Sequence, residues 1–529
     1  MNRRDFVRVV GGTAAAVGLS GVGAAVVDAQ QNRAPGPDAV ERDLALAALD
    51  AARSAGALYA DVRLIRARSE SLGTRERQIT NVAKTESYGI GIRAFVGGSW
   101  GFAATRNVTR DAVVRAAREA VTIAAANDRI APSRITLAPV AKVPDGRWIT
   151  PHLVDPFSVS LESKAELLFR INEEALKVKG VRFVTSSVTS LKEGRLLATT
   201  DGSIIQQTFI RVSPNVNVTA VASDNADSQT RNGAVGPAGM GWEYVTNLTL
   251  PERVIRYANE AVAKLSAEPV EAGTWDLVLH PSHLWLTIHE SIAHPSELDR
   301  ALGYEANYAG TTFLAPPDQV LGKFRLGQEL MTFVANRTER GGCATVGWDD
   351  EGIAASSYPI VDKGLFVSYQ SATREMIDVV SSMSTLKRAP GHSYGQDWSS
   401  IPFPRMPNVS LQPAARNISE EEVLASTNHG IYIEGDGSYS IDQQRYNFQF
   451  GGQTFWEIRN GRKIRQLRDV AYVARTPDFW KAMAMIGGPQ TYELGGALSD
   501  AKGQPGQLNS VSHGCPMALF RNINVIRTA

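Results

Sequence analysis

The chain has 529 residues, which is too long for one ordinary hydrophobic core and predicts two or three domains. Hydrophobic residues make up 43% and charged residues 21%, a balance typical of soluble globular proteins, and the formal charge of +1 indicates neither a nucleic acid nor an anionic membrane as partner. The two cysteines, Cys343 and Cys515, exclude a disulfide scaffold; either they form one pair, or one of them is a candidate metal ligand.

Residues 1–29 are predicted to be an export signal. Arg3 and Arg4, followed by a phenylalanine and a third arginine, resemble the twin-arginine signal, and a weakly apolar run rich in glycine and alanine covers residues 9–27. The glycines and the aspartate at its end make this run a poor membrane span, so we expect no stable membrane insertion. We expect a mature chain of residues 30–529 that is periplasmic or otherwise exported; a frayed N-terminal helix in a cytoplasmic protein is the alternative.

Residues 30–134 are predicted to form an N-terminal α/β domain. A polar linker broken by prolines precedes a helix, and alternating segments around a Gly97-Gly98 turn then predict strands. Thr109 is expected to cap a second helix whose apolar residues share one face. The predicted elements are a helix at 40–54, strands near 60–65, 87–95 and 100–103, and a helix that includes 113–124.

Residues 135–270 are predicted to form a central α+β domain. The Asp201-Gly202 turn between two alternating segments is a strong hairpin signal. The predicted elements are a helix at 163–179, strands at 182–188, 195–199, 204–212 and 216–221, and a closing helix at 251–265.

Residues 271–529 are predicted to form a β-rich C-terminal domain, which makes the fold class of the whole chain α+β. Residues 446–450 alternate apolar and polar side chains, as expected for a strand with one buried face. A further strand at 455–458 is joined through Asn460-Gly461 to the next strand, which indicates a hairpin.

Early in this domain, a short buried strand at 275–279 ends at His280-Pro281, and Ser282 is expected to cap the helix that follows. A strand, a tight turn and a helix in this order can position active-site residues. His280 and His283 are further candidate metal ligands, but they lie some two turns from His294 on this helix.

The same helix carries the sequence His289-Glu290-Ser291-Ile292-Ala293-His294. Two imidazoles with a neighbouring carboxylate are the minimum set for holding and using a hydrolytic zinc ion. In the usual H-E-x-x-H motif the histidines lie about 40° apart around a helix, whereas a five-residue spacing places them about 140° apart. Pro295 is expected to cause a π-bulge, a kink or a stop at His294, which can bring both rings to one metal ion. Two unrelated histidines of an apolar helix are the alternative.

Two other segments carry competing chemistry. Residues 391–395 fit the G-x-S-x-G pattern around Ser393, but a serine nucleophile elbow needs a buried strand before the serine and a helix after it. Loop-like sequence flanks this segment on both sides, so we expect no elbow. Residues 349–352, Asp-Asp-Glu-Gly, resemble a cation-binding cluster but lack the oxygen-ligand series of an EF-hand, so a solvated turn is expected.

Further fragments, in order behind the H-E-x-x-x-H motif, resemble the TldD/PmbA metallopeptidase family over nearly the whole mature chain. Glu297 follows His294 by three residues, as in that family's extended motif. Three later segments are similar to its acidic turn, its proline-arginine-methionine loop and its glycine-tyrosine signature. These segments are residues 350–352, 402–408 and 430–432.

The resemblance implies a zinc peptidase with an N-terminal α/β domain, a central domain and a β-rich catalytic domain. Members of the family are dimers, some pairing an active subunit with a relative that lacks the metal motif, and they cleave unfolded or flexible peptides in an internal cavity. For this chain it implies Zn²⁺ bound by His289 and His294, Glu290 as the general base that activates zinc-bound water, and a homodimer or a heterodimer with a related subunit. The alternative is a catalytically silent subunit that binds a partner.

The third zinc ligand is where this sequence departs from the family pattern. The family has a cysteine in a glycine-cysteine-glycine-lysine loop, whereas the best-matching loop here has Asp500 at that position. We expect Cys515 to be the third ligand, because two histidines and a thiolate with water in the fourth position are a sound catalytic set. Asp500, His513, Glu297 or no third protein ligand are the alternatives. Cys343 needs no chemical role as a small buried hydrophobe.

Overall fold

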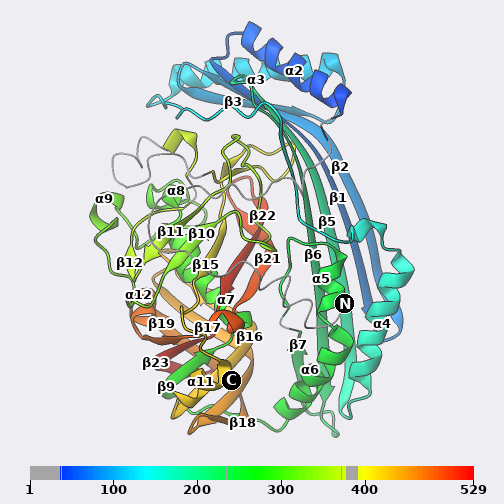
Figure 1. The fold of residues 1–529 in the computed structure, drawn as a ribbon, viewed down its shortest axis with the longest axis vertical. Helices are drawn as coiled ribbons and strands as arrows, with labels where there is room; N and C mark the ends of the chain where they lie inside the picture. The colour runs from blue at the N-terminus through cyan, green and yellow to red at the C-terminus, as the bar shows by residue number, and fades with distance from the viewer. Residues whose placement is uncertain (1–35, 37, 234, 371, 377–390, 529) are drawn as a thin grey trace.

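One long, curved sheet runs through the N-terminal and central parts of the chain, and the C-terminal part lies alongside it (Figure 1). The computed structural model describes residues 36, 38–233, 235–370, 372–376 and 391–528, so the predicted export signal lies outside the described residues. The sheet has the order β3-β2-β1-β5-β6-β4, with β7 paired to β6, and it therefore crosses the boundary expected after residue 134. Strands and helices mix in all parts of the molecule, which confirms the α+β class.

The four longest strands form two hairpins that pair side by side. β1 (Tyr59–Arg75) pairs antiparallel with β2 (Gln78–Val96) and with β5 (Val181–Thr199), and β5 pairs with β6 (Ile204–Val221). The prediction of two short strands in place of each of β5 and β6 is wrong. The first half of β5 alternates between buried and open positions, its middle is half-buried, and its last five residues are buried on both faces. The alternation is therefore lost from the sequence although the strand continues.

Helices cover both ends of this sheet and create two separate cores. At one end α2, capped by the Asp38 side chain, packs with α3, which begins after Thr109 without the predicted side-chain cap. At the other end α4, capped by Ser160, packs with α6. The other helices and strands of these two parts are α2 (Ala39–Ser54), β3 (Ser99–Thr105), α3 (Arg110–Ile130), β4 (Gly146–Ile149), α4 (Leu161–Leu176), β7 (Ser228–Asn232), α5 (Trp242–Asn247) and α6 (Leu250–Lys264).

Among the described residues, no helix is both long and apolar enough to cross a membrane.

The C-terminal part is built on a second sheet of order β16-β9-β23-β19-β17-β18-β8, with β20 paired to β23. The predicted hairpin at Asn460-Gly461 is confirmed between β17 and β18. The strands of this sheet are β8 (Glu268–Pro269), β9 (Gly273–Leu279), β16 (His429–Ile441), β17 (Asn447–Arg459), β18 (Arg462–Arg468), β19 (Val470–Arg475), β20 (Met483–Ile486) and β23 (Ala518–Arg527).

Smaller sheets and short helices surround this second sheet. The sheets are β12-β11-β10-β15, β13-β14 and β21-β22. Their strands are β10 (Phe333–Asn336), β11 (Ser357–Asp362), β12 (Leu365–Phe366), β13 (Ser393–Tyr394), β14 (Phe403–Pro404), β15 (Asn408–Leu411), β21 (Glu493–Lys502) and β22 (Gln507–Cys515). The helices are α7 (Pro281–Ile288), α8 (Leu298–Ala301), α9 (Pro317–Val320), α11 (Glu420–Ala425) and α12 (Thr476–Lys481).

Buried arginines of the long sheet bind the acidic turn of the C-terminal part. Arg195 Nη1 donates to Asp350 Oδ2 at 3.1 Å and to the Gly395 carbonyl at 2.9 Å, and Arg93 lies 3.5 Å from Glu351. The prediction of a solvated turn at residues 349–352 is therefore wrong, because guanidinium groups take the place of water around these carboxylates. Burial raises the pKa of Glu351 to about 8.

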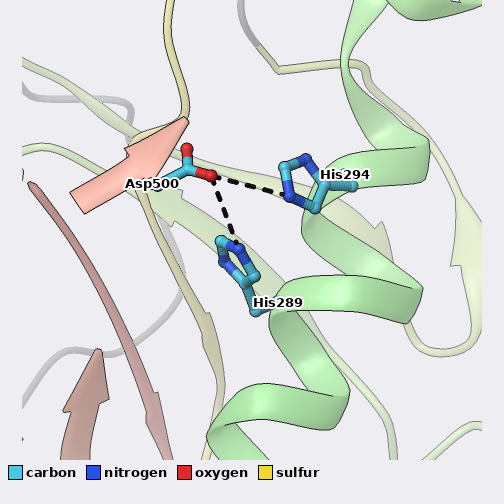
Figure 2. A group of neighbouring side chains, drawn as sticks. All are labelled: His289, His294 and Asp500. Carbon is cyan, nitrogen blue, oxygen red and sulfur yellow. Dashed lines mark ion pairs between the residues drawn. The ribbon is translucent and has the colours of Figure 1, made fainter. Parts of the chain in front are cut away.

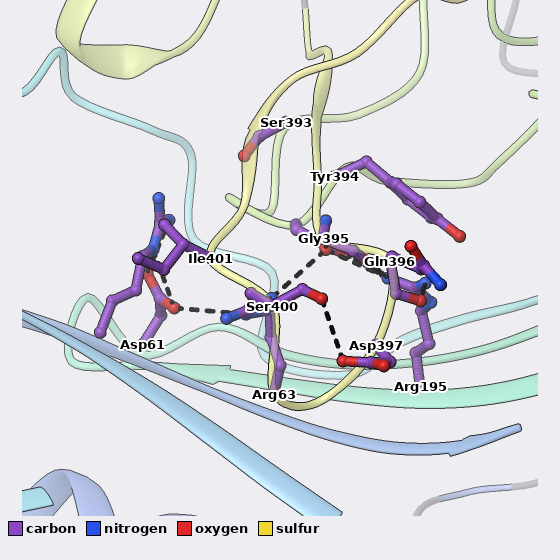
Figure 3. Close-up of polar contacts among 12 residues, drawn as sticks. Asp61, Arg63, Arg195, Ser393, Tyr394, Gly395, Gln396, Asp397, Ser400 and Ile401 are labelled. Carbon is purple, nitrogen blue, oxygen red and sulfur yellow. Dashed lines mark hydrogen bonds and ion pairs between the residues drawn. The ribbon is translucent and has the colours of Figure 1, made fainter. Parts of the chain in front are cut away.

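The G-x-S-x-G segment is a clamped loop rather than a nucleophile elbow (Figure 3). Ser393 lies in the two-residue strand β13, and turn and bend residues rather than a helix follow it. Arg63 Nη1 donates to the Ser400 carbonyl at 3.0 Å and so ties the loop to β1. The Ser393 hydroxyl is buried and has no hydrogen-bond partner among the described residues, so no base activates it.

Candidate metal centre

The helix that carries the two histidines starts at a proline. α7 follows β9 directly, and the His280 side chain caps it by accepting a hydrogen bond from the Ser282 amide at 3.2 Å. The predicted cap, Ser282, is thus already inside the helix, because Pro281 suits the first helical position. The Ser282 hydroxyl instead lies 2.8 Å from His280 Nδ1 and accepts from the Gly435 amide of β16 at 3.1 Å.

The five-residue spacing of the histidines is accommodated by a π-helical turn. α7 ends at Ile288, residues His289–Ala293 form the π turn, and His294 begins a short 3₁₀ turn with Pro295. A wider turn carries the chain around by five residues rather than four, so His289 and His294 face the same way. Their ring centroids lie 4.5 Å apart (Figure 2), and the predicted local widening is confirmed.

Asp500 of β21 is the third group at this point. Its Oδ1 lies 3.6 Å from His289 Nε2 and 3.7 Å from His294 Nε2 (Figure 2). These separations are too long for hydrogen bonds. Ligand atoms about 2 Å from a tetrahedral zinc ion lie roughly 3.3 Å from one another, so the three atoms fit around one small ion. Among the described residues, this is the group of histidine, cysteine and carboxylate side chains with metal-binding spacing.

Cys515, the expected third ligand, lies elsewhere. Strand β22 pairs Asn509 with Asp500, whereas Cys515 pairs with Glu493 at the other end of the same hairpin. Six residues of extended strand span roughly 20 Å. The Cys515 thiol instead contacts the Pro281 carbonyl at 3.7 Å, and burial raises its pKa well above 9.0, which disfavours a thiolate. The geometry therefore favours Asp500 over Cys515.

A neighbouring histidine fixes the proton of His289. His513 Nδ1 lies 2.9 Å from the Val409 carbonyl, which can only accept, so this nitrogen carries the hydrogen. Burial, followed by the charge of His289, lowers the pKa of His513 well below 6.5 and keeps it neutral, so its Nε2 is an acceptor. His289 Nδ1, 2.8 Å away, must then be the donor. In the neutral form of the His289 ring, the lone pair of Nε2 then faces Asp500 Oδ1.

A carboxylate does the same for His294. Glu297 Oε2 accepts from His294 Nδ1 at 3.1 Å, which leaves the Nε2 lone pair on the side of Asp500. Burial lowers the pKa of His294 well below 6.5, so the ring is neutral. Lys502 pairs with the other oxygen of Glu297 at 3.0 Å and with Asp299 at 2.7 Å.

Asp500 has its own support. Arg405 Nη2 donates to Asp500 Oδ2 at 3.1 Å and to its backbone carbonyl at 2.6 Å. Oδ1 therefore remains turned to the two imidazoles. Burial raises the pKa of Asp500, while His289 and Arg405 oppose this rise. A cation bound between the three groups would stabilise the carboxylate form.

Glu290 lies beside this centre and is also buried. Its Oε2 forms an ion pair with Arg445 Nη1, from the loop between β16 and β17. The hydroxyl of Tyr439 on β16 lies near the same carboxylate, and the negative charge of Glu290, followed by burial, raises the pKa of Tyr439 to about 12. The Glu290 carboxylate is thus next to His289 in sequence. In space it is held by Tyr439 of β16 and by Arg445 of the loop between β16 and β17.

The remaining candidate ligands have other partners. His283 Nδ1 contacts the Gly435 carbonyl at 3.0 Å and its Nε2 contacts the Tyr472 hydroxyl at 3.0 Å, so neither nitrogen points to the centre. His280 is the cap of α7. His513 and Glu297, which the sequence offers as alternative ligands, instead orient His289 and His294. Arg445 was missed, since one arginine in a hairpin loop gives no signal in a single sequence.

A cavity of about 700 Å³ adjoins α7 and β21. Its lining includes Ser282 and Trp285 of α7 and residues 493–498 of β21, two residues before Asp500. Among the described strands, β21 pairs on one side only, with β22. The cavity therefore adjoins the strand that carries the candidate ligand.

Comparisons with known proteins cover the same three parts of the chain. The model of the PmbA/TldA metallopeptidase C-terminal domain matches residues 272–527, that of the central domain matches 154–267, and that of domain 1 matches 60–124. The first of these matches includes the two histidines, Glu290 and Asp500.

Two of the relatives that are similar to this chain over most of their length come from archaea. Metalloprotease MJ0996 of Methanocaldococcus jannaschii is 23% identical over 411 residues, covering 78% of this chain and 85% of the relative. A metalloprotease of Methanothermobacter thermautotrophicus is 25% identical over 470 residues, covering 88% and 95%. The crystal structure of TldE from Thermococcus kodakarensis superposes with a TM-score of 0.69 at 13% identity, covering 92% of this chain and all of that one, and this likeness concerns the fold alone.

Proposed function

Because the chain belongs to the PmbA/TldA metallopeptidase family, we propose that it is a zinc-dependent peptidase whose metal is held by His289, His294 and Asp500. The observation that carries this proposal is the direction of the lone pairs. The two Nδ1 atoms donate to His513 and Glu297, so Nε2 is the nitrogen of each imidazole that faces Asp500 Oδ1 and offers its lone pair there when the ring is neutral. Two imidazoles and one carboxylate with an open fourth position are a known catalytic zinc set.

The chain's own residues supply the proton transfers. A bound zinc ion would polarise the scissile carbonyl and make water more acidic. Glu290, next in sequence to His289, accepts the proton of the attacking water and passes it to the leaving nitrogen. His289 and His294 keep their orientation throughout, because His513 and Glu297 hold their Nδ1 atoms.

We further propose that the substrate is an extended, flexible peptide. The free edge of β21 can pair with a peptide backbone whatever its side chains, and the adjoining cavity gives those side chains room. A peptide lying along residues 493–498 would continue towards Asp500. An internally folded substrate could not present such a strand, which is why we expect cleavage of unfolded segments only.

We propose a dimer, either of two copies or with a related subunit, as the family resemblance implies. Arg3 and Arg4 support export through the twin-arginine route. Replacing both by lysine should leave an unprocessed precursor in the cytoplasm, and cell fractionation would detect it; normal processing of the variant would contradict the proposed route.

The proposed base is tested with Glu290→Gln. The amide keeps the shape of the side chain and leaves the imidazoles unchanged, so bound zinc should remain, while hydrolysis of an unfolded peptide should fall by at least ~10²-fold. Glu268→Gln, at an exposed carboxylate, is the matched control and should keep full activity. A metal-loaded Glu290→Gln protein with activity within a few-fold of wild type would exclude the assigned role.

One observation favours the second candidate, a catalytically silent subunit. The ion pair with Arg445 occupies a carboxylate oxygen of Glu290 that a general base would need for the proton of water. A silent subunit would bind a partner and show no hydrolysis even when zinc is bound at the site. Activity of the purified, zinc-loaded chain alone separates the two functions.

A further inference from the structure

Arg445 reaches the metal centre with more hydrogen-bond donors than the described structure uses. Its Nη1 pairs with Glu290, and its Nε is buried without a hydrogen-bond partner among the described residues. A guanidinium carries five N–H donors in a planar fork. Donors therefore remain after the ion pair with Glu290 is made.

The loop between β16 and β17 fixes the position of this side chain. Arg445 has a left-handed backbone with φ of 60°, its amide donates to the Asp442 carbonyl at 3.0 Å, and its carbonyl accepts from the Thr476 hydroxyl at 2.7 Å. The Asp442 carboxylate in turn accepts from the amides of Tyr446 and Asn447 at 2.8 and 3.0 Å. A non-glycine residue held in this conformation by its surroundings is common where a side chain must be presented in one direction.

Exposure separates Arg445 from the other cations near the centre. The side chains of Arg300, Arg405 and Lys502 are 1%, 0% and 2% exposed, so a substrate cannot touch them. Arg445 is 15% exposed. Its positive charge also lowers the pKa of His294, second only to burial, which places the guanidinium close to that metal-binding residue. It is thus a positive group that a bound peptide can reach beside the reaction centre.

We infer that Arg445 donates to the carbonyl oxygen of the bond being cleaved when that oxygen becomes negatively charged. This inference rests on the proposed peptidase function. As the oxygen of water bonds to the carbonyl carbon, the carbonyl π pair moves to its oxygen, and the proton lost by water goes to Glu290. The pair then returns, the carbon–nitrogen bond breaks, and Glu290 delivers the proton to the departing nitrogen. Arg445 stabilises the stage at which the oxygen carries the charge.

The same guanidinium chemistry would also suit the C-terminal carboxylate of a bound peptide. The carbonyl oxygen at the cleaved bond and the C-terminal carboxylate can be distinguished by the choice of substrate. An oxygen at the cleaved bond is present in every peptide, whereas a terminal carboxylate is removed by amidation. Peptides of one sequence with free and amidated C-termini therefore distinguish the two sources.

The first experiment measures binding rather than turnover. A phosphinic peptide, whose charged tetrahedral group replaces the scissile amide, is titrated into zinc-loaded protein by calorimetry. Arg445→Met should weaken its binding by about 10²- to 10³-fold, whereas the affinity for an uncleaved peptide amide, measured in the Glu290→Gln background, should change little. Arg475→Met, which removes an exposed arginine at the end of β19 that pairs with Asp478 of α12, is the matched control.

The same titration in the Glu290→Gln background isolates the role of Arg445. If Arg445 only holds Glu290, its substitution has no effect once Glu290 is an amide, and the inference is overturned. If Arg445 contacts the developing anion, the loss persists in the double variant. This background also removes the unpaired buried carboxylate that could unfold the single variant.

The second experiment measures hydrolysis of the two peptides. Arg445→Met and Arg445→Lys should lower kcat on both to a similar extent with little change in KM. A loss confined to the free carboxylate would overturn the inference in favour of terminal recognition. Failure of the proposed function itself looks different, because the zinc-loaded wild-type chain would then hydrolyse neither peptide.

Discussion

The two histidines of the candidate metal centre are oriented through their Nδ1 atoms by different kinds of partner. His289 leads through His513 to the Val409 carbonyl, a chain without formal charge that we call the neutral arm. His294 leads to Glu297 and Lys502, a buried set of ions that we call the charged arm. Each arm leaves Nε2 of its histidine on the side of Asp500. The neutral arm needs no counter-charge, whereas the charged arm is stable only while its ions remain together.

Asp500 joins the two arms, so its loss should have the largest effect. Asp500→Asn removes the oxygen anion that faces both imidazoles and should lower zinc affinity by more than the ~10- to 100-fold typical of outer-shell changes. Cys515→Ser, at the other end of the same hairpin, should keep zinc. Bound zinc after dialysis against a weak chelator measures both. Retention in the Asp500 variant with loss in the Cys515 variant would reverse our assignment.

Breaking the charged arm should come next. Glu297→Gln leaves Lys502 with less compensation in a fully buried position, so the free energy of unfolding should fall by about 3–5 kcal/mol. Zinc affinity should fall by ~10- to 100-fold because His294 loses its anchor. Chemical denaturation of the metal-free protein gives the first value and competition with a chelator gives the second.

The control for this change is the exposed ion pair of Glu268 with Arg465. Glu268→Gln should cost less than about 1 kcal/mol, since water screens such pairs. Equal losses for Glu297→Gln and Glu268→Gln would mean that the charged arm is not a cooperative buried unit.

Breaking the neutral arm should cost less stability. His513→Phe preserves a flat ring beside Trp285, against which His513 lies nearly parallel, but removes the bonds to His289 and Val409. We expect a loss of about 1–3 kcal/mol, the range for leaving buried polar groups unsatisfied. Zinc affinity should still fall ~10- to 100-fold, as in the charged arm. A larger stability loss here than in Glu297→Gln would invert the comparison.

The two arms should also respond to different ranges of pH. The pKa of folded His513 lies below 6.5, so the unfolded chain binds more protons and stability falls as the pH drops below about 6.5. The pKa of folded Glu297 lies well below 4.5, so its contribution is complete above that pH and is lost only at lower values. Acid therefore weakens the neutral arm first.

His513→Phe tests this difference in the metal-free protein. Between pH 6.5 and 4.5, stability should decline less steeply in the variant, by at most about 1.4 kcal/mol per pH unit for one histidine. His283, His294 and His392, whose pKa values burial also lowers, contribute a decline of their own to both proteins. Parallel stability curves would show that His513 does not titrate as described.

The histidine pair was predictable because its constraint is local. The spacing of His289 and His294 and the proline after them predict a π-bulge, a kink or a stop at His294, and the structure contains the π turn. The same holds for the hairpin at Asn460-Gly461, where turn chemistry and alternation agree.

The third ligand was not predictable, because it depends on strand register. Asp500 and Cys515 lie on opposite strands of one hairpin, and a sequence does not say which end of β21 meets α7. The acidic turn at 349–352 was expected in water for a similar reason. Its arginine partners come from strands more than 150 residues earlier, and nothing local marks the pairing.

Diffraction from zinc-loaded crystals at the zinc absorption edge tests the central claim most directly. The account predicts one strong anomalous peak within about 2.0–2.2 Å of His289 Nε2, His294 Nε2 and Asp500 Oδ1, with no sulfur ligand. A peak bound by the Cys515 sulfur, or no peak between the two imidazoles in zinc-replete protein, would contradict it.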